Sequence, residues 1–345
     1  MHKIKELIKK VDRSLLWIWA KSAFLSSFYY FLISGKFRRE HQSVLAGRAQ
    51  QVRELKRENA HFYTLVRNTH RIEKGLLMRP RRDVFALDFI EETVSNFLIL
   101  YKVPQFSSEP QIQWSYEVLT EYFKVTSNHP VIEEQRKQFL SVTNDLLGSV
   151  SGSDSLIPYE RNEKKKPNIS YEDFLALTRY RRSVRWFLNK PVPHDLIDKA
   201  LMAARQSPSA CNRQPFEYRI IDEPEALNRV TNLPMGIKGY QHNIPMMIVV
   251  VGNLEAYFNE RDRHVVYIDA SLANMAFMFA LETLGLSSCS INWPDIESLE
   301  KRMEKELSLK KYQRPIMCMA VGYPDSKGKV AYSEKRSIEK LRKYN

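Results

Sequence analysis

The second half of the chain alternates short apolar runs with stretches whose apolar residues recur at helical spacing. Residues 246–251 are apolar at every position, which is typical of a strand buried on both faces. Residues 269–284 are apolar on nearly every side of a helix, so this helix must be buried. The expected strands are 216–221, 246–251, 287–292 and 316–321, and the expected helices are 171–179, 195–205, 269–284 and 298–307. This pattern predicts an α+β domain over residues 170–345.

The first half of the chain carries helical spacing without strand-like runs. A thin apolar stripe follows one face of a polar helix over residues 42–77, and further helices are expected over residues 84–150. Residues 151–169 are rich in Ser, Lys and Pro, which is the composition of a linker. We therefore expect a mostly helical region at 1–150, a linker at 151–169 and the α+β domain at 170–345.

A group of cations lies where the polar helix is expected to end, at His70, Arg71 and Lys74, followed by Gly75. Glycine often ends a helix, and cations in the last turn interact favourably with the negative end of the helix dipole. We favour this structural interpretation. In the alternative, these cations and the three arginines of residues 79–82 contact an anion or a substrate.

An apolar and aromatic stretch at residues 15–33 lies between two basic groups near the N-terminus. Its length approaches the roughly 20 residues that a membrane-spanning helix needs, but Lys21 and several hydroxyl groups interrupt it. Flanking cations and aromatic rings are typical of a helix that lies in the interface of an anionic membrane. We favour this peripheral placement for residues 1–40 over burial within the protein or a true membrane span.

Composition narrows the choice of partner and compartment. The chain has 345 residues and a net charge of +13, which indicates an anionic partner such as a phosphorylated cofactor or a membrane surface. Cys211, Cys289 and Cys318 are too widely spaced for a zinc motif or a disulfide framework, so we expect a reducing, cytoplasmic location. No nucleic-acid-binding motif accompanies the charge, so we expect no nucleic-acid partner.

Two nearby motifs carry the candidate chemistry. The first motif, residues 181–187, reads RRSVRWF and supplies three guanidinium groups and a hydroxyl, which together suit an oxyanion such as a phosphate. Alternation along an extended chain would place Arg181, Ser183 and Arg185 on one side. The second motif, residues 207–215, reads SPSACNRQP, and its small and amide side chains allow close approach to a flat, hydrogen-bonding ligand.

In this order and about one helix apart, the two motifs resemble those of the FMN-dependent nitroreductase family, and the resemblance extends over residues 171–345. It implies a central mixed β-sheet flanked by helices and a homodimer that binds FMN. It also implies a ping-pong reaction in which NAD(P)H delivers hydride and a second small molecule takes the electrons. The chain has no nucleophile poised by a base and no metal-ligand spacing, which fits an enzyme whose cofactor carries the chemistry.

The resemblance also assigns roles to individual residues. The implied FMN contacts are Arg181, Arg182, Ser183 and Arg185 at the phosphate, ribityl chain and pyrimidine edge, Pro208, Ser209 and Asn212 at the ring from the other subunit, Ser290 and Asn292 near N5, and Arg336 at the phosphate. The chain departs from the family at Trp293, where the family often has a small residue. An indole at that position would narrow or cap the pocket.

The sequence does not identify the substrate. Extensions with a His-Arg-x-Glu-Lys-Gly run, as at residues 70–75, accompany some nitroreductase-like proteins linked to surface polysaccharide assembly. We therefore expect an FMN oxidoreductase that reduces or oxidises a small or surface-polysaccharide-related substrate. The alternative is a flavin-binding or membrane-docked scaffold without turnover, which would not be reduced by NAD(P)H.

Overall fold

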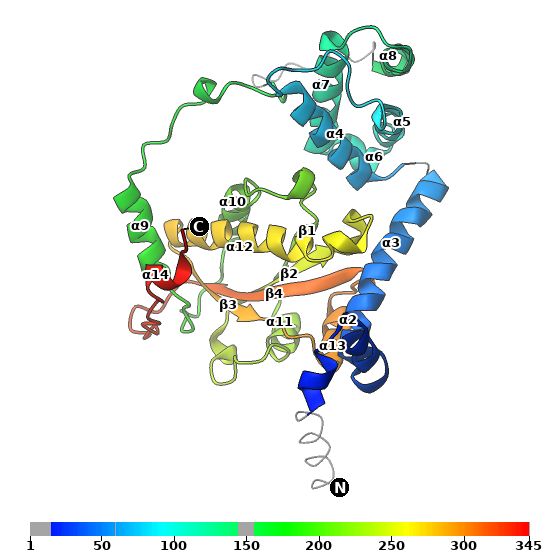
Figure 1. The fold of residues 1–345 in the computed structure, drawn as a ribbon. Coiled ribbons are helices and arrows are strands. Elements are labelled where there is room, and N and C mark those ends of the chain that lie inside the picture. The colour runs from blue at the N-terminus through cyan, green and yellow to red at the C-terminus, as the bar shows by residue number, and fades with distance from the viewer. Residues whose placement is uncertain (1–14, 59, 144–154, 345) are drawn as a thin grey trace.

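The structure of this chain is a computed structural model that describes residues 15–58, 60–143 and 155–344. A sheet with helices on both faces forms its C-terminal part, and a bundle of helices lies beyond one face of that sheet (Figure 1). One long helix, α3 (Arg38–Glu58), joins the two parts (Figure 1). The basic residues expected before residue 15 lie outside the described residues. This arrangement confirms the prediction of an α+β fold preceded by helices.

In the described residues, the sheet has four strands in the order β1-β2-β4-β3, and hydrogen-bonded neighbours are antiparallel. The strands are β1 (Phe216–Ile221), β2 (Met246–Asn253), β3 (Ser287–Asn292) and β4 (Gln313–Gly322). The expectation of a mixed sheet is therefore corrected. Within the described ranges, the parallel pairing is limited to an isolated bridge between Ser183 and Ser288, where the first motif meets β3.

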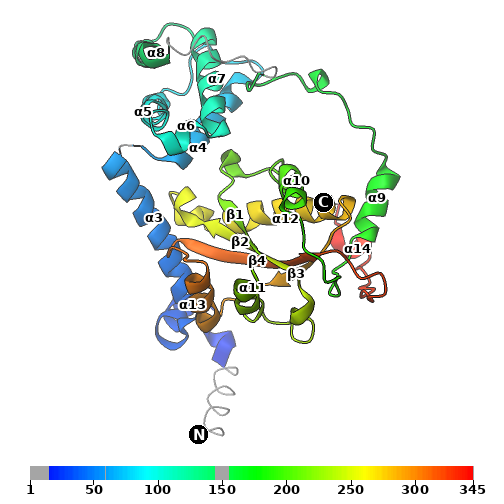
Figure 2. The same cartoon turned by 180° about the vertical axis from the view of Figure 1, so that it is seen from behind.

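Strand β2 lies between two hydrophobic cores, because its side chains point alternately to the two faces of the sheet. Helices α10 (His194–Ala204) and α12 (Val265–Thr283) cover one face, and α11 (Pro224–Thr231) and α13 (Glu297–Glu306) cover the other (Figures 1 and 2). Double coverage explains why β2 is apolar at every position but its last.

Helix α12 begins four residues earlier than expected and is not covered on every side by its own chain. Phe277 and Leu281 are fully buried against the sheet, whereas Ile268 and Leu272 are 56% and 46% exposed. The stretch Glu260–Thr283 is long and apolar enough to cross a membrane. Its packing against β2, β3 and α10 identifies it instead as a core helix with one free apolar edge.

The helical bundle has a hydrophobic core of its own, which includes Leu65, Phe97, Leu119 and Phe139. Its helices are α4 (Phe62–Leu76), α5 (Ile90–Leu100), α6 (Pro104–Ser107), α7 (Pro110–Val125) and α8 (Pro130–Thr143). The single helix expected over residues 42–77 is two helices, α3 and α4. They separate at His61, where the backbone is extended and the N–H donates to Asn96 Oδ1 at 2.6 Å.

Gly75 is not a helix cap, which corrects the expectation from its position. It lies inside α4, and the cap is Leu77. A Cβ added to Gly75 would lie 2.3 Å from the ring of Phe85, so glycine is required for close packing rather than for a left-handed turn. The neighbouring cations have partners, since His70 contacts Glu73 at 3.2 Å and the Arg71 guanidinium contacts Asp88 at 3.2 Å.

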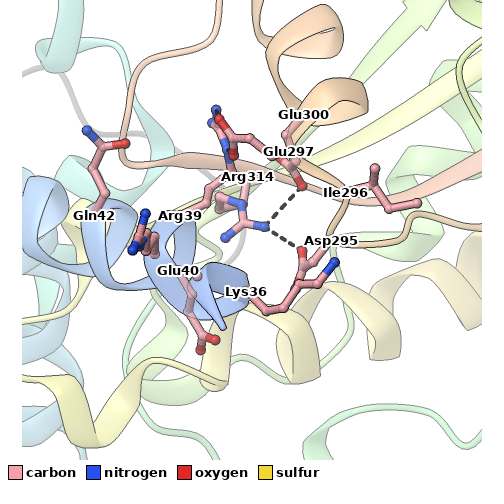
Figure 3. A pocket seen from close by; sticks show the side chains of 11 residues that line it. Lys36, Arg39, Glu40, Gln42, Asp295, Ile296, Glu297, Glu300 and Arg314 are labelled. Carbon is pink, nitrogen blue, oxygen red and sulfur yellow. Dashed lines mark hydrogen bonds and ion pairs between the residues drawn. The ribbon is translucent and has the colours of Figure 1, made fainter. Parts of the chain in front are cut away.

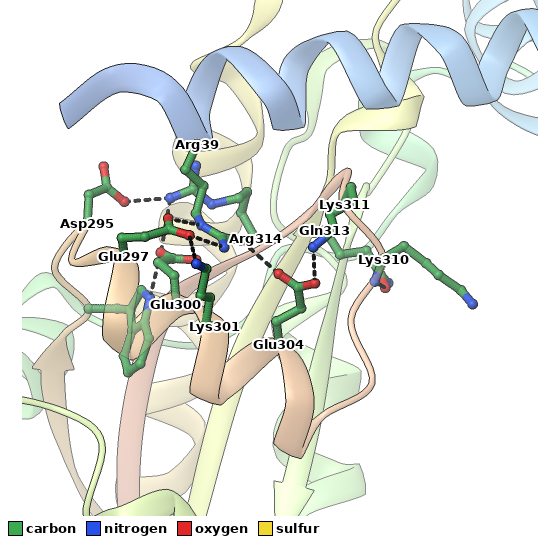
Figure 4. Close-up of polar contacts among 11 residues, drawn as sticks. Arg39, Asp295, Glu297, Glu300, Lys301, Glu304, Lys310, Lys311, Gln313 and Arg314 are labelled. Atoms are coloured by element: carbon green, nitrogen blue, oxygen red, sulfur yellow. Dashed lines mark hydrogen bonds and ion pairs between the residues drawn. The ribbon is translucent and has the colours of Figure 1, made fainter. Parts of the chain in front are cut away.

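Helix α3 is anchored to the C-terminal part of the chain. It packs against the 3-10 helix η7 (Leu254–Ala256), and a Cβ on Gly47 would lie 2.6 Å from the backbone of Leu254. At the other end of α3, Arg39 pairs with Glu297 at 2.6 Å and with Glu304 at 2.9 Å (Figure 4). Helix α3 therefore packs on the sheet domain rather than in the bundle. The domain boundaries predicted at residues 150 and 170 stay a prediction.

A buried arginine lies beneath this contact. Arg314 is 1% exposed, and its Nη2 lies 2.5 Å from Asp295 and 3.0 Å from Glu300 (Figure 4). A cavity of about 550 Å³ separates this network from the start of α3, and Lys36, Arg39 and Glu40 face it from the helix side (Figure 3). Removing one partner from such a buried pair leaves an uncompensated charge, so the pair fixes the loop before α13.

The apolar N-terminal stretch is not one continuous helix. Residues 15–19 are helical, the chain turns at Ala20 and Lys21, and α2 (Ala23–Phe28) then leads into a π-helix (Tyr29–Ile33). A membrane-spanning helix needs roughly 20 uninterrupted residues, so this geometry disfavours a span. Most of its aromatic side chains are exposed.

Residues 155–169, in the predicted linker, run extended and mostly exposed between the bundle and helix α9, with one 3-10 turn (Arg161–Glu163) (Figure 1).

The contact between α3 and η7 contains an unusual carboxyl group, Glu255. Burial, reinforced by the nearby charge of Glu54, raises the pKa of Glu255 from 4.5 to about 7. The folded state therefore holds a proton that the unfolded chain releases above about pH 4.5. As a result, the free energy of unfolding falls as the pH rises from about 4.5 to about 7, and the loss is complete above that.

Substituting Glu255→Gln removes this titration without removing the hydrogen-bonding group. We expect the variant to lose less melting temperature than the wild type between about pH 5 and about pH 8. Thermal unfolding at the two pH values measures the difference. Glu225→Gln changes an exposed carboxylate on α11 and should keep the wild-type loss. Equal losses in the wild type and in Glu255→Gln would contradict the assignment.

Candidate functional site

Helix α9 (Tyr171–Tyr180) leads directly into the first motif. It ends where the backbone N–H of Arg181 donates to the carbonyl of Leu177 at 3.0 Å. The chain then runs extended beside β3, and the N–H of Val184 donates to the carbonyl of Ser288 at 3.1 Å. Because Val184 is buried in the core, the motif is fixed at its centre while the arginines on either side remain near the surface.

Asn243 fixes the far end of the first motif. Its Oδ1 accepts the backbone N–H of Phe187 at 2.8 Å, and its Nδ2 donates to the carbonyl of Arg185 at 3.1 Å. The motif thus receives two side-chain hydrogen bonds that hold its backbone extended. Sequence reasoning missed this role, since nothing in the stretch before Asn243 aligned it with a partner 56 residues away.

The guanidinium groups of the first motif have no ion pair with a carboxylate in the part of the chain that the structure describes. Arg182 and Arg185 donate instead to carbonyls of the motif itself, at 3.3 Å and 3.4 Å. Arg181 Nε and Ser288 Oγ are buried without a hydrogen-bond partner. The charge of Arg181 acts on the half-buried Glu282, where it partly offsets the rise that burial gives to the pKa of that carboxyl. Cations without an ion pair and unpartnered donors at one place fit an oxyanionic ligand such as a phosphate.

Strand β3 carries two further candidate residues away from this place. Ser290 lies two positions beyond Ser288, so it points to the same face of the sheet, where its Oγ is 3.0 Å from Met278 Sδ. Asn292 is exposed at the end of the strand, about 13 Å along from Ser288 at about 3.3 Å per residue. The structure therefore places Ser290 and Asn292 on the α12 face of β3, further along the strand than the bridge at Ser288.

Trp293 does not cap a pocket, contrary to the expectation from sequence. Its indole is 6% exposed and donates from Nε1 to Glu300 at 2.9 Å, so it belongs to the core beneath α13. Arg336 is exposed in the coil before the short helix α14 (Ile338–Leu341). Helix α14 lies on the same side of the molecule as α9 (Figures 1 and 2). The structure brings this tail to the side of the first motif.

The second motif forms a strained loop. It contains the 3-10 turn η5 (Ala210–Asn212), and Cys211, Asn212 and Gln214 have φ angles of 54°, 54° and 49°. Positive φ is uncommon outside glycine, and each such residue costs on the order of 1 kcal/mol or more unless its surroundings hold it. Strain of this kind concentrates at functional sites, and here three strained residues lie within four positions.

Asp269 holds this loop in place. The side chain is 3% exposed, and its Oδ2 accepts hydrogen bonds from Ser209 Oγ at 2.6 Å and from the N–H of Ala210 at 2.9 Å. Ser209 Oγ in turn accepts from the N–H of Gln214 at 2.8 Å. Sequence reasoning missed this residue. The available signal was that Asp269 is the one charged residue in residues 265–281.

The two motifs lie at opposite ends of the sheet within one chain. Ser288, beside the first motif, pairs with Val321, which is next to the first residue of β2 across the sheet. The second motif enters β1 at Phe216, which pairs with Gly252 near the last residue of β2. Strand β2 has 8 residues, or about 25 Å at about 3.3 Å per residue. One chain therefore does not bring Arg185 and Asn212 together.

Comparison with known proteins finds a family model and relatives that match part of this chain. The nitroreductase family model matches residues 178–236 and 229–323. The chain is 28% identical over 160 residues to a putative NADH dehydrogenase/NAD(P)H nitroreductase of Methanothermobacter thermautotrophicus, covering 45% of this chain and 80% of that protein. It is 22% identical over 216 residues to iodotyrosine deiodinase 1 of Homo sapiens, covering 54% of this chain and 73% of that protein.

A solved FMN-dependent nitroreductase from Clostridium difficile R20291 is similar with a TM-score of 0.43 and 24% identity, covering 50% of this chain and 99% of that one. The family match falls on the part of the chain that contains the sheet and both motifs. The C-terminal half of this chain is therefore similar to the nitroreductase family.

Proposed function

We propose that this protein is an FMN-dependent oxidoreductase that takes hydride from NAD(P)H and passes electrons to a second small molecule in a ping-pong cycle. The match of the C-terminal half to the nitroreductase family model, and its similarity to an NAD(P)H nitroreductase, support an oxidoreductase domain. The observation that carries the choice of cofactor is the set of three arginines in the first motif that form no ion pair with a carboxylate among the described residues. The NAD(P)H in the name of the Methanothermobacter relative supports the reductant.

Each candidate residue has a task that its surroundings support. Arg181, Arg182 and Arg185 would bind the phosphate and the pyrimidine edge of FMN through charge-assisted hydrogen bonds, and Ser183 would add a compact donor. Arg336 would reach the phosphate from the exposed coil before α14. FMN supplies the hydride acceptor when bound, so the chain needs no nucleophile or metal of its own.

A second copy of the chain would complete the site. Pro208, Ser209 and Asn212 lie at the other end of the sheet from the first motif, so residues of both motifs could meet at one FMN only across two subunits. The free apolar edge of α12, at Ile268 and Leu272, supports a homodimer, because apolar surface of this kind is normally covered. A twofold axis would then create two equivalent FMN sites.

Arg185→Ala tests the cofactor assignment with an exposed side chain whose loss the fold tolerates. A charge-assisted hydrogen bond contributes roughly 1.5 to 3 kcal/mol, so FMN affinity should fall about tenfold to a hundredfold. The double variant Arg181→Ala/Arg185→Ala should be colourless and still fold. Flavin absorbance of the purified proteins, with a melting curve for folding, measures both effects.

Arg229→Ala is the matched control, since this exposed arginine on α11 pairs with Glu306 and should leave flavin content unchanged. Full yellow colour in a folded Arg181→Ala/Arg185→Ala protein would remove the first motif from the FMN site. A yellow protein that NAD(P)H does not bleach would instead favour the flavin-binding scaffold without turnover.

We further propose that this protein is cytoplasmic and attaches to the surface of an anionic membrane through its N-terminal segment. Trp17, Phe24 and Phe31 are 61%, 78% and 74% exposed, which is a large unsatisfied aromatic surface. Exposed Lys36 and Arg38 lie beside it, and each cation near an anionic surface contributes about 1 kcal/mol to attachment. Aromatic rings flanked by cations suit the lipid interface.

Phe24→Glu/Phe31→Glu should abolish sedimentation of the protein with phosphatidylglycerol vesicles, because two charges then face the lipid. Met235→Glu places one charge at another exposed apolar side chain and should sediment like the wild type. Sedimentation of the double variant at the wild-type level would contradict the proposal. Wild-type protein that neither high salt nor carbonate releases would show a span in place of peripheral attachment.

A further inference from the structure

The helical bundle rests directly on the second motif. Helix α4 packs against η5, and Gln111 of α7 donates from Nε2 to the carbonyl of Asn212 at 2.9 Å. The bundle therefore contacts the strained loop that is proposed to line the flavin. The two arginines at this junction, Arg213 from the loop and Arg67 from α4, have no role in the site described above.

Arg213 is a buried cation without a counterion. Its side chain is 5% exposed, and its guanidinium carbon lies 5.2 Å and 5.6 Å from the ring centroids of Tyr257 and Phe258. Its Nε has no hydrogen-bond partner, and over the described ranges it forms no ion pair with a carboxylate. Aromatic faces stabilise a guanidinium partially, but they leave its in-plane donors unsatisfied.

Arg67 shares the ring of Phe258 with Arg213. Its guanidinium carbon lies 4.7 Å from the centroid of that ring, and the side chain is half-buried. Burial lowers the pKa of Arg67, and the positive charges of Arg71 and Arg213 lower it further. Two cations are thus held close to each other by packing, an arrangement that costs free energy when no anion lies between them.

Two carboxylates near this pair also have other partners, and one of them, Glu92, attracts Arg67 without forming an ion pair with it. Asp269 is bonded to Ser209 and to the backbone of Ala210, and Glu92 accepts from Asn68 Nδ2 at 2.8 Å. Arg71, one turn along α4, differs from Arg67 because its Nη2 contacts Asp88 at 3.2 Å. Among the described residues, Arg67 and Arg213 therefore differ from Arg71 because neither forms an ion pair with a carboxylate.

We propose that Arg67 and Arg213 form an oxyanion-binding site at the junction of the helical bundle and the second motif, which receives a phosphate or carboxylate group of a ligand that reacts at the flavin. The assignment of this ligand to the flavin rests on the proposed function; the anion site itself rests on the arginine pair. The planar, multiple donors of guanidinium groups suit oxyanions, and two of them can hold one anion from two sides.

The site gives the helical half a role in specificity. An oxyanion held here would orient the rest of the ligand, and the residues that hold it come from α4 in the bundle and from the loop of the catalytic domain. Two ligands could supply the anion, namely the electron acceptor or the phosphates of NAD(P)H. The chemistry at the arginines is the same in both cases, and kinetics distinguishes them.

The first test uses sulfate as the probe and does not need turnover. The rise in melting temperature of the full-length protein with sodium sulfate is compared with that in sodium chloride at equal ionic strength. Arg67→Gln and Arg213→Gln should each reduce the apparent sulfate affinity about tenfold or more. Arg71→Gln is the matched control and should behave like the wild type, because Arg71 already pairs with Asp88. Any binding of sulfate at the first motif is common to all four proteins.

The second test assigns the source of the anion. If the acceptor supplies it, kcat/KM for 4-nitrobenzoate should fall about tenfold or more in Arg67→Gln while kcat/KM for the neutral 4-nitrobenzyl alcohol stays unchanged. If NAD(P)H supplies it, the rate of flavin reduction at low NAD(P)H should fall in Arg67→Gln and both acceptors should keep their relative rates.

Equal sulfate dependence in the wild type, Arg67→Gln and Arg213→Gln would overturn the proposal. Arg67→Gln decides the case if Arg213→Gln fails to fold, because Arg67 is partly exposed and its removal leaves no cavity in the core. If the wild-type protein is colourless but Arg67→Gln still reduces its sulfate affinity, the proposed function is refuted and the anion site is not. If the wild-type protein is yellow but Arg67→Gln leaves the sulfate affinity unchanged, the anion site is refuted and the proposed function is not.

Discussion

The hydrogen bonds of a buried carboxylate, Asp269, fix the loop on which the rest of the site depends. This side chain lies in the core helix α12 and accepts from Ser209 and from the backbone of Ala210. A buried carboxylate is stable only when hydrogen bonds satisfy it, and a loop with three residues at positive φ persists only when its surroundings hold it. The hydrogen bonds from the loop offset the free-energy cost of burying the Asp269 carboxylate, and the same hydrogen bonds hold the loop in its strained conformation.

The same loop is where the two halves of the chain meet. Helix α3 is fastened to the sheet domain by Gly47 against Leu254 and by Arg39 between Glu297 and Glu304. It carries the bundle to the other side of the domain, where α4 and Gln111 contact η5. The bundle is therefore held at two places, and the second is the loop proposed to face the flavin. This geometry explains how a helical extension can influence a reaction in a domain that it does not belong to.

The sequence predicted the parts of the structure that depend on local pattern. The apolar run at β2 and the nearly all-apolar α12 were evident because burial on two faces removes polar positions. Asn243, Asp269 and Arg213 were not evident, because their roles depend on partners that are distant in sequence or on the absence of a partner. Gly75 and Trp293 were assigned wrong roles for a related reason. Gly75 is determined by close packing against Phe85 and Trp293 by a hydrogen bond to Glu300, and neither contact leaves a periodic pattern in the sequence.

The central claim is that each FMN site combines the first motif of one subunit with the second motif of its partner. A mixed dimer tests it directly, with Arg181→Ala/Arg185→Ala in one subunit and Pro208→Glu in the other, selected by two different tags. Each variant alone should form a homodimer with little FMN. In the mixed dimer one site carries both defects and the other carries neither, so about half of the wild-type FMN content should return. A mixed dimer without FMN, or a stable FMN-loaded monomer, would contradict the account.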